Sequence, residues 1–539
     1  MNTVYQRFAT TAGQAPDDDF LQIEAVTAEA YGIAAGRVSW REAARRVREL
    51  RDDFERAGWG HGHRVGLLLE NRPDFLYHWF ALNALGASVV PINAEMRAAE
   101  LEYLIGHSEI GLAVTLPGRE HDLRAAAAAA GVRCRTLVPG GAVPAPAAPA
   151  PDAGRSPGLA SECALLYTSG TTGRPKGCRL SNDYFLRAGQ WYAGLDGVCS
   201  VRPGRERVIT PLPLNHVNAM AFSTMVVVTA GGCLIQLDRF HPRSWWQSVR
   251  DTGATIVHYL GVMPAMLLAA APAAADREQA VRWGFGAGVD KKNHAPFEER
   301  FGFPLVEAWA MTETGAAACI MANHEPRHVG TSCFGRPEAF VETSLVDEAG
   351  APVPVGTPGE LLVRSSGADP RRHFYTEYLK DPEATREAWA DGWFHTGDMV
   401  RADADGRLYF VDRKKNVIRR SGENISAVEV ESVLNQHPLV QASAVAAAPD
   451  ALRGDEVLAC IVLKQPAAAD RHPELAAELV RHALANLAYY KAPGHVAFVE
   501  SLPLTASQKI QRGEMRTLAQ RLPGQPGCID TRPLKKRPA

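Results

Sequence analysis

The sequence predicts an α/β protein with a large N-terminal domain of helix-covered sheets, a β-rich subdomain and a small α+β C-terminal domain. Apolar runs typical of buried strands alternate with helical patterns from about residue 39 onward, and this alternation indicates a parallel sheet covered by helices. From about residue 335 to 412, short alternating strands are separated by Pro/Gly turns, which indicates a β-rich segment. A length of 539 residues exceeds one compact core and favours two or three domains.

The N-terminal domain is expected over residues 1–412. Helical spacing marks residues 39–58, 73–85 and 290–301, and apolar runs predict strands at 64–70, 88–91, 164–167, 207–214, 233–237, 255–260, 281–285 and 305–309. Strands at 341–346, 360–363 and 407–411 belong to the β-rich subdomain at about 335–412.

The C-terminal domain is expected over residues 413–539. Its predicted helices cover residues 427–436 and 473–487, and its predicted strands cover 442–447, 457–463 and 496–500. The tail after about residue 522 is basic and rich in proline, so we expect it to be loosely held.

Composition excludes several classes of protein. The 58 Lys and Arg residues against 60 Asp and Glu residues give a net charge of −2, which favours neither nucleic acid nor an anionic membrane surface as a partner. Nine scattered cysteines without a Cys-x-x-Cys pair fit neither a disulfide framework nor a structural zinc site. No stretch is typical of a signal peptide or a membrane span. These features predict a cytoplasmic enzyme with reduced thiols and no integral membrane association.

A turn rich in glycine and hydroxyl groups follows the apolar run at 164–167. Its candidate ligand-binding residues are Thr168, Ser169, Gly170, Thr171, Thr172 and Lys176. Glycines let the backbone approach an anion, hydroxyls donate hydrogen bonds, and lysine adds a positive charge. The turn therefore predicts a site for the phosphates of a nucleoside triphosphate, with a plain solvated loop as the alternative. A P-loop NTPase is excluded, because Lys176 is followed by Gly177 rather than Ser or Thr.

Five stretches in matching order resemble the acyl-adenylate-forming superfamily, which includes acyl-CoA synthetases, firefly luciferase and the adenylation domains of peptide synthetases. They are the turn at 165–177, Trp-Ala-Met-Thr-Glu-Thr-Gly at 309–315, Gly-Trp-Phe-His-Thr-Gly-Asp at 392–398, the run at 412–431, and Pro-Leu-Thr-Ala-Ser-Gln-Lys-Ile-Gln-Arg at 503–512. Together they span most of the chain. The pattern looks most like bacterial acyl-CoA synthetases of the fatty-acid and crotonobetaine/carnitine type.

The resemblance implies roles for residues of the N-terminal domain. Thr312 would bond the α-phosphate, and Glu313 would hold Mg²⁺, a hard cation that suits few carboxylates plus phosphate oxygens. His216 would lie near the acyl carboxylate, unless it is a loop histidine bonded to backbone. Trp309, where the family usually has Tyr, would stack on adenine. The turn formed by Gly286, Ala287 and Gly288 would border adenine and the acyl pocket, with a plain strand-to-helix turn as the alternative.

The resemblance also implies roles around the C-terminal domain. Asp398 would accept from both ribose hydroxyls, with a solvated turn as the alternative, and Arg413 would contact ribose in the hinge at 412–416. Family members rotate the C-terminal domain between two half-reactions. Lys509 would bring its charge to the α-phosphate in the first, and Gly422 would border the pantetheine path in the second. The family usually has Gly before this lysine, where this chain has Gln508.

The implied function is an ATP- and Mg²⁺-dependent acid–CoA ligase. A carboxylic acid would become acyl-AMP with release of pyrophosphate, and the coenzyme A thiol would then take the acyl group. Two alternatives stay open: transfer to a carrier-protein thiol, and a nucleotide-binding regulatory protein without catalysis. The resemblance also leaves a homodimer open. By resemblance the acyl pocket is lined by His216, Val217, Ala219, Gly261, Val262, Met263, Gly288, Ala310 and Ala316, with Asn215, Asn218 and His258 as polar contacts.

Overall fold

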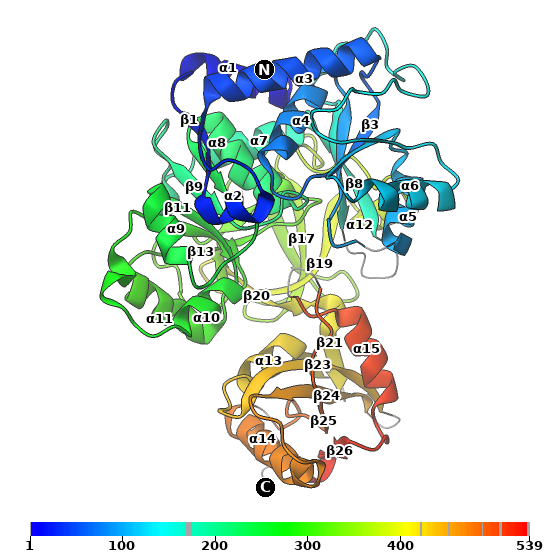
Figure 1. Ribbon diagram of the computed structural model, residues 1–539. Coiled ribbons are helices and arrows are strands. Elements are labelled where there is room, and N and C mark those ends of the chain that lie inside the picture. The colour runs from blue at the N-terminus through cyan, green and yellow to red at the C-terminus, as the bar shows by residue number, and fades with distance from the viewer. Residues whose placement is uncertain are drawn as a thin grey trace. The chain divides into compact units, whose positions relative to one another are not determined.

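Helices cover mostly parallel sheets in the N-terminal part of the chain, as predicted (Figure 1). The computed structural model describes residues 2–96, 98–168, 175–420, 423–450, 453–487, 489–505 and 509–535. Contacts divide the chain into two compact units: residues 1–343 with 363–395, and residues 344–362 with 396–539. The predicted domain boundary at 412/413 stays a prediction. The α/β fold class is confirmed.

A six-stranded sheet in the first unit has the order β6-β5-β3-β4-β7-β8. Its strands are β3 (Arg64–Leu68), β4 (Ser88–Pro91), β5 (Leu112–Thr115), β6 (Arg135–Leu137), β7 (Glu162–Thr168) and β8 (Lys176–Ser181). All pairs are parallel except the hairpin of β7 and β8. Helices α5 (Ala98–Ser108) and α6 (Glu120–Ala129) pack on one face through Leu101, Leu104 and Leu123.

An eight-stranded sheet has the order β14-β13-β12-β11-β9-β10-β1-β2. Its strands are β1 (Asp19–Ile23), β2 (Gly36–Ser39), β9 (Arg207–Thr210), β10 (Cys233–Gln236), β11 (Ile256–Leu260), β12 (Trp283–Ala287), β13 (Leu305–Trp309) and β14 (Ile320–Met321). The six strands from β13 to β1 are parallel. Their carboxyl ends therefore meet at one edge, where open α/β sheets bind ligands.

Helices cover both faces of this larger sheet. Helices α9 (Trp245–Thr252), α10 (Val262–Leu268) and α11 (Lys291–Phe301) share a core with Val257 and Tyr259 of β11. Helices α7 (Asn182–Ala193) and α8 (Thr224–Ala230) serve the other face, where Tyr192 of α7 packs on Phe285 of β12. The N-terminal helix α1 (Val4–Gln14) packs against α3 (Trp40–Ala57), α4 (Pro73–Ala84) and α8 (Figure 1).

Capping explains why several predicted helix ends are correct. The Ser39 side chain accepts from the backbone N–H of Glu42 at the start of α3, and Gly58 ends that helix in a left-handed conformation. Asp290 caps α11 in the same way by accepting from the N–H of Lys292.

A further sheet contains the strand order β20-β19-β17-β16. Its strands are β16 (Val341–Val346), β17 (Gly359–Ser365), β19 (Trp393–Ala402) and β20 (Leu408–Arg413). The alternative of a solvated turn at Asp398 is wrong, because residues 393–402 form one continuous strand and Asp398 is 1% exposed. Gly397 adopts a positive φ of 68° within this strand, which a glycine permits without strain.

The C-terminal sheet has the order β22-β21-β24-β25-β26, with β23 paired to β24. Its strands are β21 (Val417–Arg420), β22 (Glu423–Ser426), β23 (Val440–Asp450), β24 (Gly454–Leu463), β25 (His495–Phe498) and β26 (Cys528–Asp530). Helices α13 (Ala427–Leu434) and α14 (His472–Asn486) pack on one face, and α15 (Arg512–Arg521) packs on the other. The predicted α+β character is confirmed.

Residues 523–535 are not loosely held, contrary to the prediction for the tail. Strand β26 pairs with β25, and the backbone N–H of Thr531 donates to the carbonyl of Gly494 at 3.0 Å. Lys535 is buried and pairs with Glu456 at 2.5 Å. Burial lowers the pKa of Lys535 to about 8. The composition of the tail predicted a solvated segment, but its backbone completes a sheet edge and its lysine has a buried carboxylate partner.

We expect removal of residues 528–539 to loosen the C-terminal sheet. The truncation exposes the edge of β25 and removes the hydrogen bonds of Thr531, each worth about 1 kcal/mol, so amides of β24 and β25 should exchange with deuterium faster. Hydrogen exchange of the full chain and the truncated chain measures this effect. Leu534→Ser, at a position 39% exposed, is the control and should leave exchange unchanged. Equal exchange in the truncated chain would contradict the proposed role of the tail.

Candidate active site

The predicted phosphate turn joins the two strands of an antiparallel hairpin. Thr168, the last residue of β7, lies opposite Lys176, the first residue of β8. Both side chains are partly buried, at the end of the hairpin where the connecting turn begins. The predictions at Ser169, Gly170, Thr171 and Thr172 lie outside the described residues. The described strands therefore place the first hydroxyl and the lysine of the predicted turn side by side.

Glu313 and Lys176 meet at one side chain that the sequence analysis missed, Tyr378. The Tyr378 hydroxyl donates to Oε1 of Glu313 at 2.8 Å, and the Lys176 ammonium lies over the Tyr378 ring, 4.8 Å from its centroid. Burial, together with the charge of Glu313, raises the pKa of Tyr378 well above its usual value, so the phenol stays protonated. The structure therefore brings together two residues predicted from separate motifs.

Backbone pairing explains how Tyr378 reaches this position. The N–H of Arg179 in β8 donates to the carbonyl of Glu377, and the N–H of Leu379 donates to the carbonyl of Gly177. Residues 376–379 thus run along β8 as an added extended segment. Tyrosine alone carries no phosphate-binding signal in a sequence, and only this pairing identifies its role.

Trp309 is the last residue of β13, and Thr312 precedes Glu313 in the loop that follows. Thr312 is partly buried, and its carbonyl accepts from the Tyr184 hydroxyl at 2.9 Å. Trp309 is 6% exposed, and its ring stacks on Phe334 with centroids 6.2 Å apart. Little of the indole is therefore open to solvent, and the proposed stacking on adenine depends on its edge or remaining face.

The turn after β12 is held by a buried carboxylate. Glu307 of β13 accepts from the backbone N–H groups of Gly288 and Val289, both at 2.9 Å. Gly286 is buried, whereas Ala287 and Gly288 are exposed. A side chain at Gly286 would collide with the carbonyl oxygen of Tyr259, 2.3 Å from its Cβ. The exposed part of the turn is therefore rigid and open at Ala287 and Gly288.

His216 is exposed in the loop after β9, and an amide clamp holds the residues before it. The Asn71 side chain accepts from the N–H of Leu214 at 2.9 Å and donates to the carbonyl of Leu237 at 2.8 Å. Gln236 donates to the carbonyl of Leu212 at 2.9 Å. Sequence reasoning missed these two amides, since each lies far along the chain from the loop it holds.

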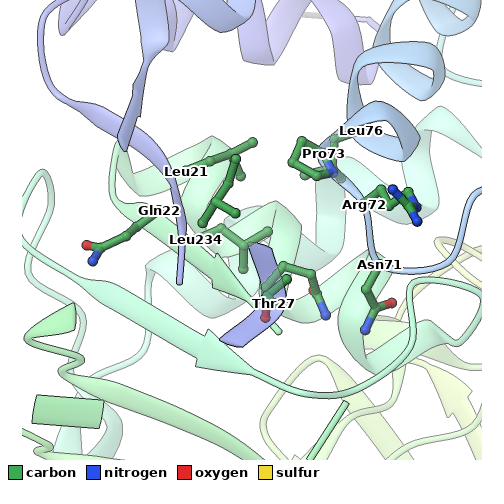
Figure 2. Close-up of a pocket in the computed structure, with 10 residues that line it drawn as sticks. Leu21, Gln22, Thr27, Asn71, Arg72, Pro73, Leu76 and Leu234 are labelled. Carbon is green, nitrogen blue, oxygen red and sulfur yellow. The ribbon is translucent and has the colours of Figure 1, made fainter. Parts of the chain in front are cut away.

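A small pocket lies beside the amide clamp (Figure 2). It is lined by Leu21, Thr27, Asn71, Pro73, Leu76 and Leu234, among others. Its volume of about 10 Å³ matches one water molecule. This pocket is therefore too small for a nucleotide or an acid, and we assign it to packing.

Asp398 and Arg413 lie directly opposite each other across β19 and β20 in the second unit. The Arg413 guanidinium pairs with the Asp398 carboxylate at 2.7 Å, and the Asp398 side chain is 1% exposed. Beside them, Glu360 accepts from the N–H of Gly397 at 3.2 Å and from the Lys414 ammonium at 2.6 Å. The two residues predicted to contact ribose therefore form one charged pair.

Two hydrogen bonds join Lys509 to Thr505. The N–H of Thr505 donates to the carbonyl of Lys509 at 2.7 Å, and the N–H of Lys509 donates to the Thr505 hydroxyl at 3.1 Å. Arg512 anchors the following helix by pairing with Glu431 at 2.6 Å. Lys509 is exposed as a residue, but protein atoms around its ammonium and the charge of Arg413 lower its pKa. The prediction at Gly422 lies outside the described residues.

The carboxylate of Glu313 suits a Mg²⁺ ion that is also bound by substrate phosphates better than a metal ion held by protein side chains alone. Within the described ranges, no group of three or more His, Cys, Asp or Glu side chains gathers as a metal cluster. Mg²⁺ commonly uses one or two carboxylates together with substrate phosphates, and Glu313 offers one buried carboxylate near Lys176.

In the described part of the chain, no helix has the length and hydropathy to cross a membrane.

We expect Tyr378→Phe to lower pyrophosphate release by about 10- to 100-fold, the usual effect of losing a group that orients a metal ligand. The variant keeps the ring beneath Lys176 and removes only the hydroxyl that fixes Glu313. The rate should be measured as a function of Mg²⁺ concentration, and the apparent Mg²⁺ affinity should fall. Tyr375→Phe is the control for losing a neighbouring phenol, because the Tyr375 ring packs on Tyr378 with centroids 4.8 Å apart, whereas the Tyr378 hydroxyl is the one that donates to Glu313. An unchanged Mg²⁺ dependence in Tyr378→Phe would contradict the role of this contact.

Comparison with known proteins identifies the family of the chain. The AMP-binding enzyme family matches residues 8–368, and the AMP-binding enzyme C-terminal domain matches residues 429–509. The chain is 30% identical over 510 residues to a crotonobetaine/carnitine–CoA ligase of Escherichia coli (strain SE11), covering 91% of this chain and 95% of the relative. A crotonobetaine/carnitine–CoA ligase of Shigella sonnei is 29% identical over 515 residues, with the same coverage.

Two solved structures share the fold of this chain. The crystal structure of ATP-bound MatB from Rhodopseudomonas palustris superposes with a TM-score of 0.80 at 26% identity, covering 97% of this chain and 99% of MatB. The o-succinylbenzoate CoA synthetase MenE from Bacillus subtilis, in complex with its acyl-adenylate, shares the fold with a TM-score of 0.79 at 22% identity, covering 96% of this chain and 98% of MenE. The chain therefore belongs to the AMP-binding enzymes and is an AMP-forming acid–thiol ligase.

Proposed function

We propose that this ligase activates a carboxylic acid with ATP and Mg²⁺ and then transfers the acyl group to coenzyme A. The observation that carries the proposal is the meeting of Lys176 and Glu313 at Tyr378. It supplies a cation for phosphate and a carboxylate for the metal at the edge where strand β13 ends. The relatives named CoA ligases support the same reaction.

The chain's own residues act by charge and alignment. The substrate carboxylate attacks the α-phosphate, pyrophosphate leaves, and the thiol of coenzyme A later displaces AMP from the acyl carbon. Lys176 and Thr168 contact phosphate oxygens, and Thr312 bonds the α-phosphate. Glu313 would hold Mg²⁺, which when bound neutralises phosphate charge. No side chain acts as a nucleophile, since positioning and electrostatic stabilisation suffice for phosphoryl chemistry.

The nucleotide and the second half-reaction depend on residues around the C-terminal domain. Asp398 accepts from ribose, and its partner Arg413 holds its carboxylate in place. Lys509 supplies positive charge during adenylation, and Gly422 borders the path of coenzyme A. Surrounding protein atoms and the charge of Arg413 lower the pKa of Lys509, and an anionic phosphate beside the ammonium would favour its charged form. All nine cysteines are free thiols, which supports a cytoplasmic location.

The test of the proposed function is pyrophosphate release across a panel of acids, with and without coenzyme A. The panel should contain short, medium, long, aromatic and betaine-type acids, because relatives are named for crotonobetaine and carnitine. Mass spectrometry should detect an acyl-AMP without coenzyme A and a thioester with it. Absence of pyrophosphate release with every acid would overturn the proposal.

We expect Lys509→Ala to lower acyl-AMP formation by several orders of magnitude, well beyond the ~10²–10³ of losing one neutral donor. The same variant should still convert supplied acyl-AMP and coenzyme A to the thioester, because the charge is needed only when the α-phosphate is attacked. Single-turnover assays of the two half-reactions measure this separation.

The matched control for this experiment is Lys464→Ala, a lysine that follows β24 of the same C-terminal sheet. Both half-reactions should continue at the normal rate in the control. If Lys509→Ala lost both half-reactions equally while remaining folded, the assignment of Lys509 to the first step would be wrong.

A further inference from the structure

A buried polar relay lies at the face of β11 and β12 that meets helix α7. His258 of β11 pairs in register with Phe285 of β12. The Tyr192 hydroxyl lies 2.8 Å from Nε2 of His258, and Nδ1 of His258 lies 2.7 Å from Oγ of Ser223 and 2.8 Å from Oδ1 of Asn218. Tyr192, Ser223 and His258 are each 0% exposed, and Asn218 alone is partly exposed. The relay therefore ends at a single side chain that a ligand can reach.

A π-helical turn brings two of these residues to the same nitrogen. Residues Asn218–Ser223 form a π-helix that continues into α8. Its i→i+5 pattern places residues five apart on one face, and such turns are rare and frequently found at functional sites. Ser223 donates back to the carbonyl of Asn218 at 3.3 Å, and Thr224 donates to the carbonyl of Ala219 at 2.9 Å. An ordinary helix would turn Asn218 away from Ser223.

The protons of the relay have one arrangement that satisfies each group. Burial lowers the pKa of His258 to about 3 and raises that of Tyr192 well above its usual value, so the imidazole is neutral and the phenol is protonated. If Nε2 carried the proton, the Tyr192 hydroxyl would have no described acceptor for its own proton, a costly loss in a buried site. We therefore assign the Tyr192 hydroxyl as donor to Nε2, and Nδ1–H as donor to Oδ1 of Asn218.

This arrangement fixes the orientation of the Asn218 amide. Its oxygen accepts from His258, so its NH₂ group faces away from the relay. No hydrogen-bond acceptor for that NH₂ group is found among the residues that the structure describes. The Asn218 side chain is therefore a preorganised donor with a fixed direction.

The position of Asn218 connects it to the acid that the ligase activates. It follows His216 by two residues in the loop after β9, and the relay beneath it runs to strands β11 and β12, whose carboxyl ends carry the open turn at Ala287 and Gly288. Phe222 and Phe285 pack together with centroids 5.5 Å apart and shield His258 from water. A donor with a fixed direction can determine specificity, because a ligand that leaves it unpaired binds less well.

We propose that the NH₂ group of Asn218 selects acids that carry a neutral oxygen acceptor, such as a hydroxyl, keto or amide group, on the acyl chain. Asn218 is the specificity-determining residue, and Tyr192, His258 and Ser223 are positioning residues. This inference rests on the proposed function, since it concerns the acid bound at the same site. It also corrects the expectation for His258, which is fully buried and acts through Asn218 rather than by touching the acid.

The experiment compares matched pairs of acids by pyrophosphate release. Each pair consists of an unsubstituted acid and the same acid with a hydroxyl or keto group at successive chain positions. We expect the wild-type enzyme to favour one oxygenated acid over its unsubstituted partner by at least about 100-fold in kcat/KM, as sites built around a substrate hydrogen bond do. Asn218→Leu should remove this preference by lowering kcat/KM for the oxygenated acid relative to its unsubstituted partner.

Two further variants separate positioning from folding. Tyr192→Phe keeps the ring and its packing but removes the proton donor to Nε2, so the preference should fall, mainly through a higher KM for the oxygenated acid. Thr224→Ala is the matched control, because Thr224 also bonds back into the π-helical turn but does not contact His258. In this variant, the ratio of kcat/KM between the two acids should equal that of the wild type.

The outcomes distinguish this inference from the proposed function. Pyrophosphate release with equal efficiency for every matched pair overturns the inference alone, and so does a preference that Asn218→Leu leaves unchanged. No release with any acid overturns the proposed function and the inference with it. Loss of preference in Asn218→Leu and Tyr192→Phe, with retention in Thr224→Ala, supports the assignment of the relay.

Discussion

The hydroxyl of Tyr378 is the contact on which the proposed phosphate-binding end of the site depends. It holds Glu313, which follows β13, and its ring lies beneath Lys176, which begins β8. Within the described residues, Lys176 and Glu313 share this side chain without forming an ion pair with each other. A direct pair would neutralise both charges in advance. The tyrosine instead keeps a cation and a carboxylate close together and available to a ligand that needs both.

Buried polar side chains hold the loops around this point. Asn71 fixes the backbone before His216, and Glu307 fixes the backbone at Gly288. His258 fixes the amide of Asn218. A buried polar group must be hydrogen-bonded, because leaving it unpaired costs about 1–3 kcal/mol. Each loop is therefore held in the one geometry that satisfies its buried partner. The carboxyl-terminal edge of the sheet is rigid for the same reason.

Sequence patterns predicted the elements whose signals are local. Helix α3 has correct ends because Ser39 caps it and Gly58 ends it. Strand β19 was missed because Gly397 interrupts an alternation that is partly polar. Motifs likewise identified loop residues with ligand chemistry, but not their partners. Tyr378 bonds Glu313 from 65 positions away, and no spacing rule connects the two. Contacts that orient a site are long-range, and a single sequence records only their residue types.

The cost of the His258 relay argues for a role beyond stability. Phenylalanine would fill a similar volume without desolvating an imidazole, and hydrogen bonds inside a protein contribute only about 0.5–1.5 kcal/mol net. The π-helical turn that aligns Asn218 with Ser223 is a rare local geometry that an ordinary helix does not have. Neither feature is explained by packing. Both are explained if the core orients one hydrogen-bond donor toward a ligand. Departures from the usual rules of local structure that bring no gain in stability are expected at functional sites.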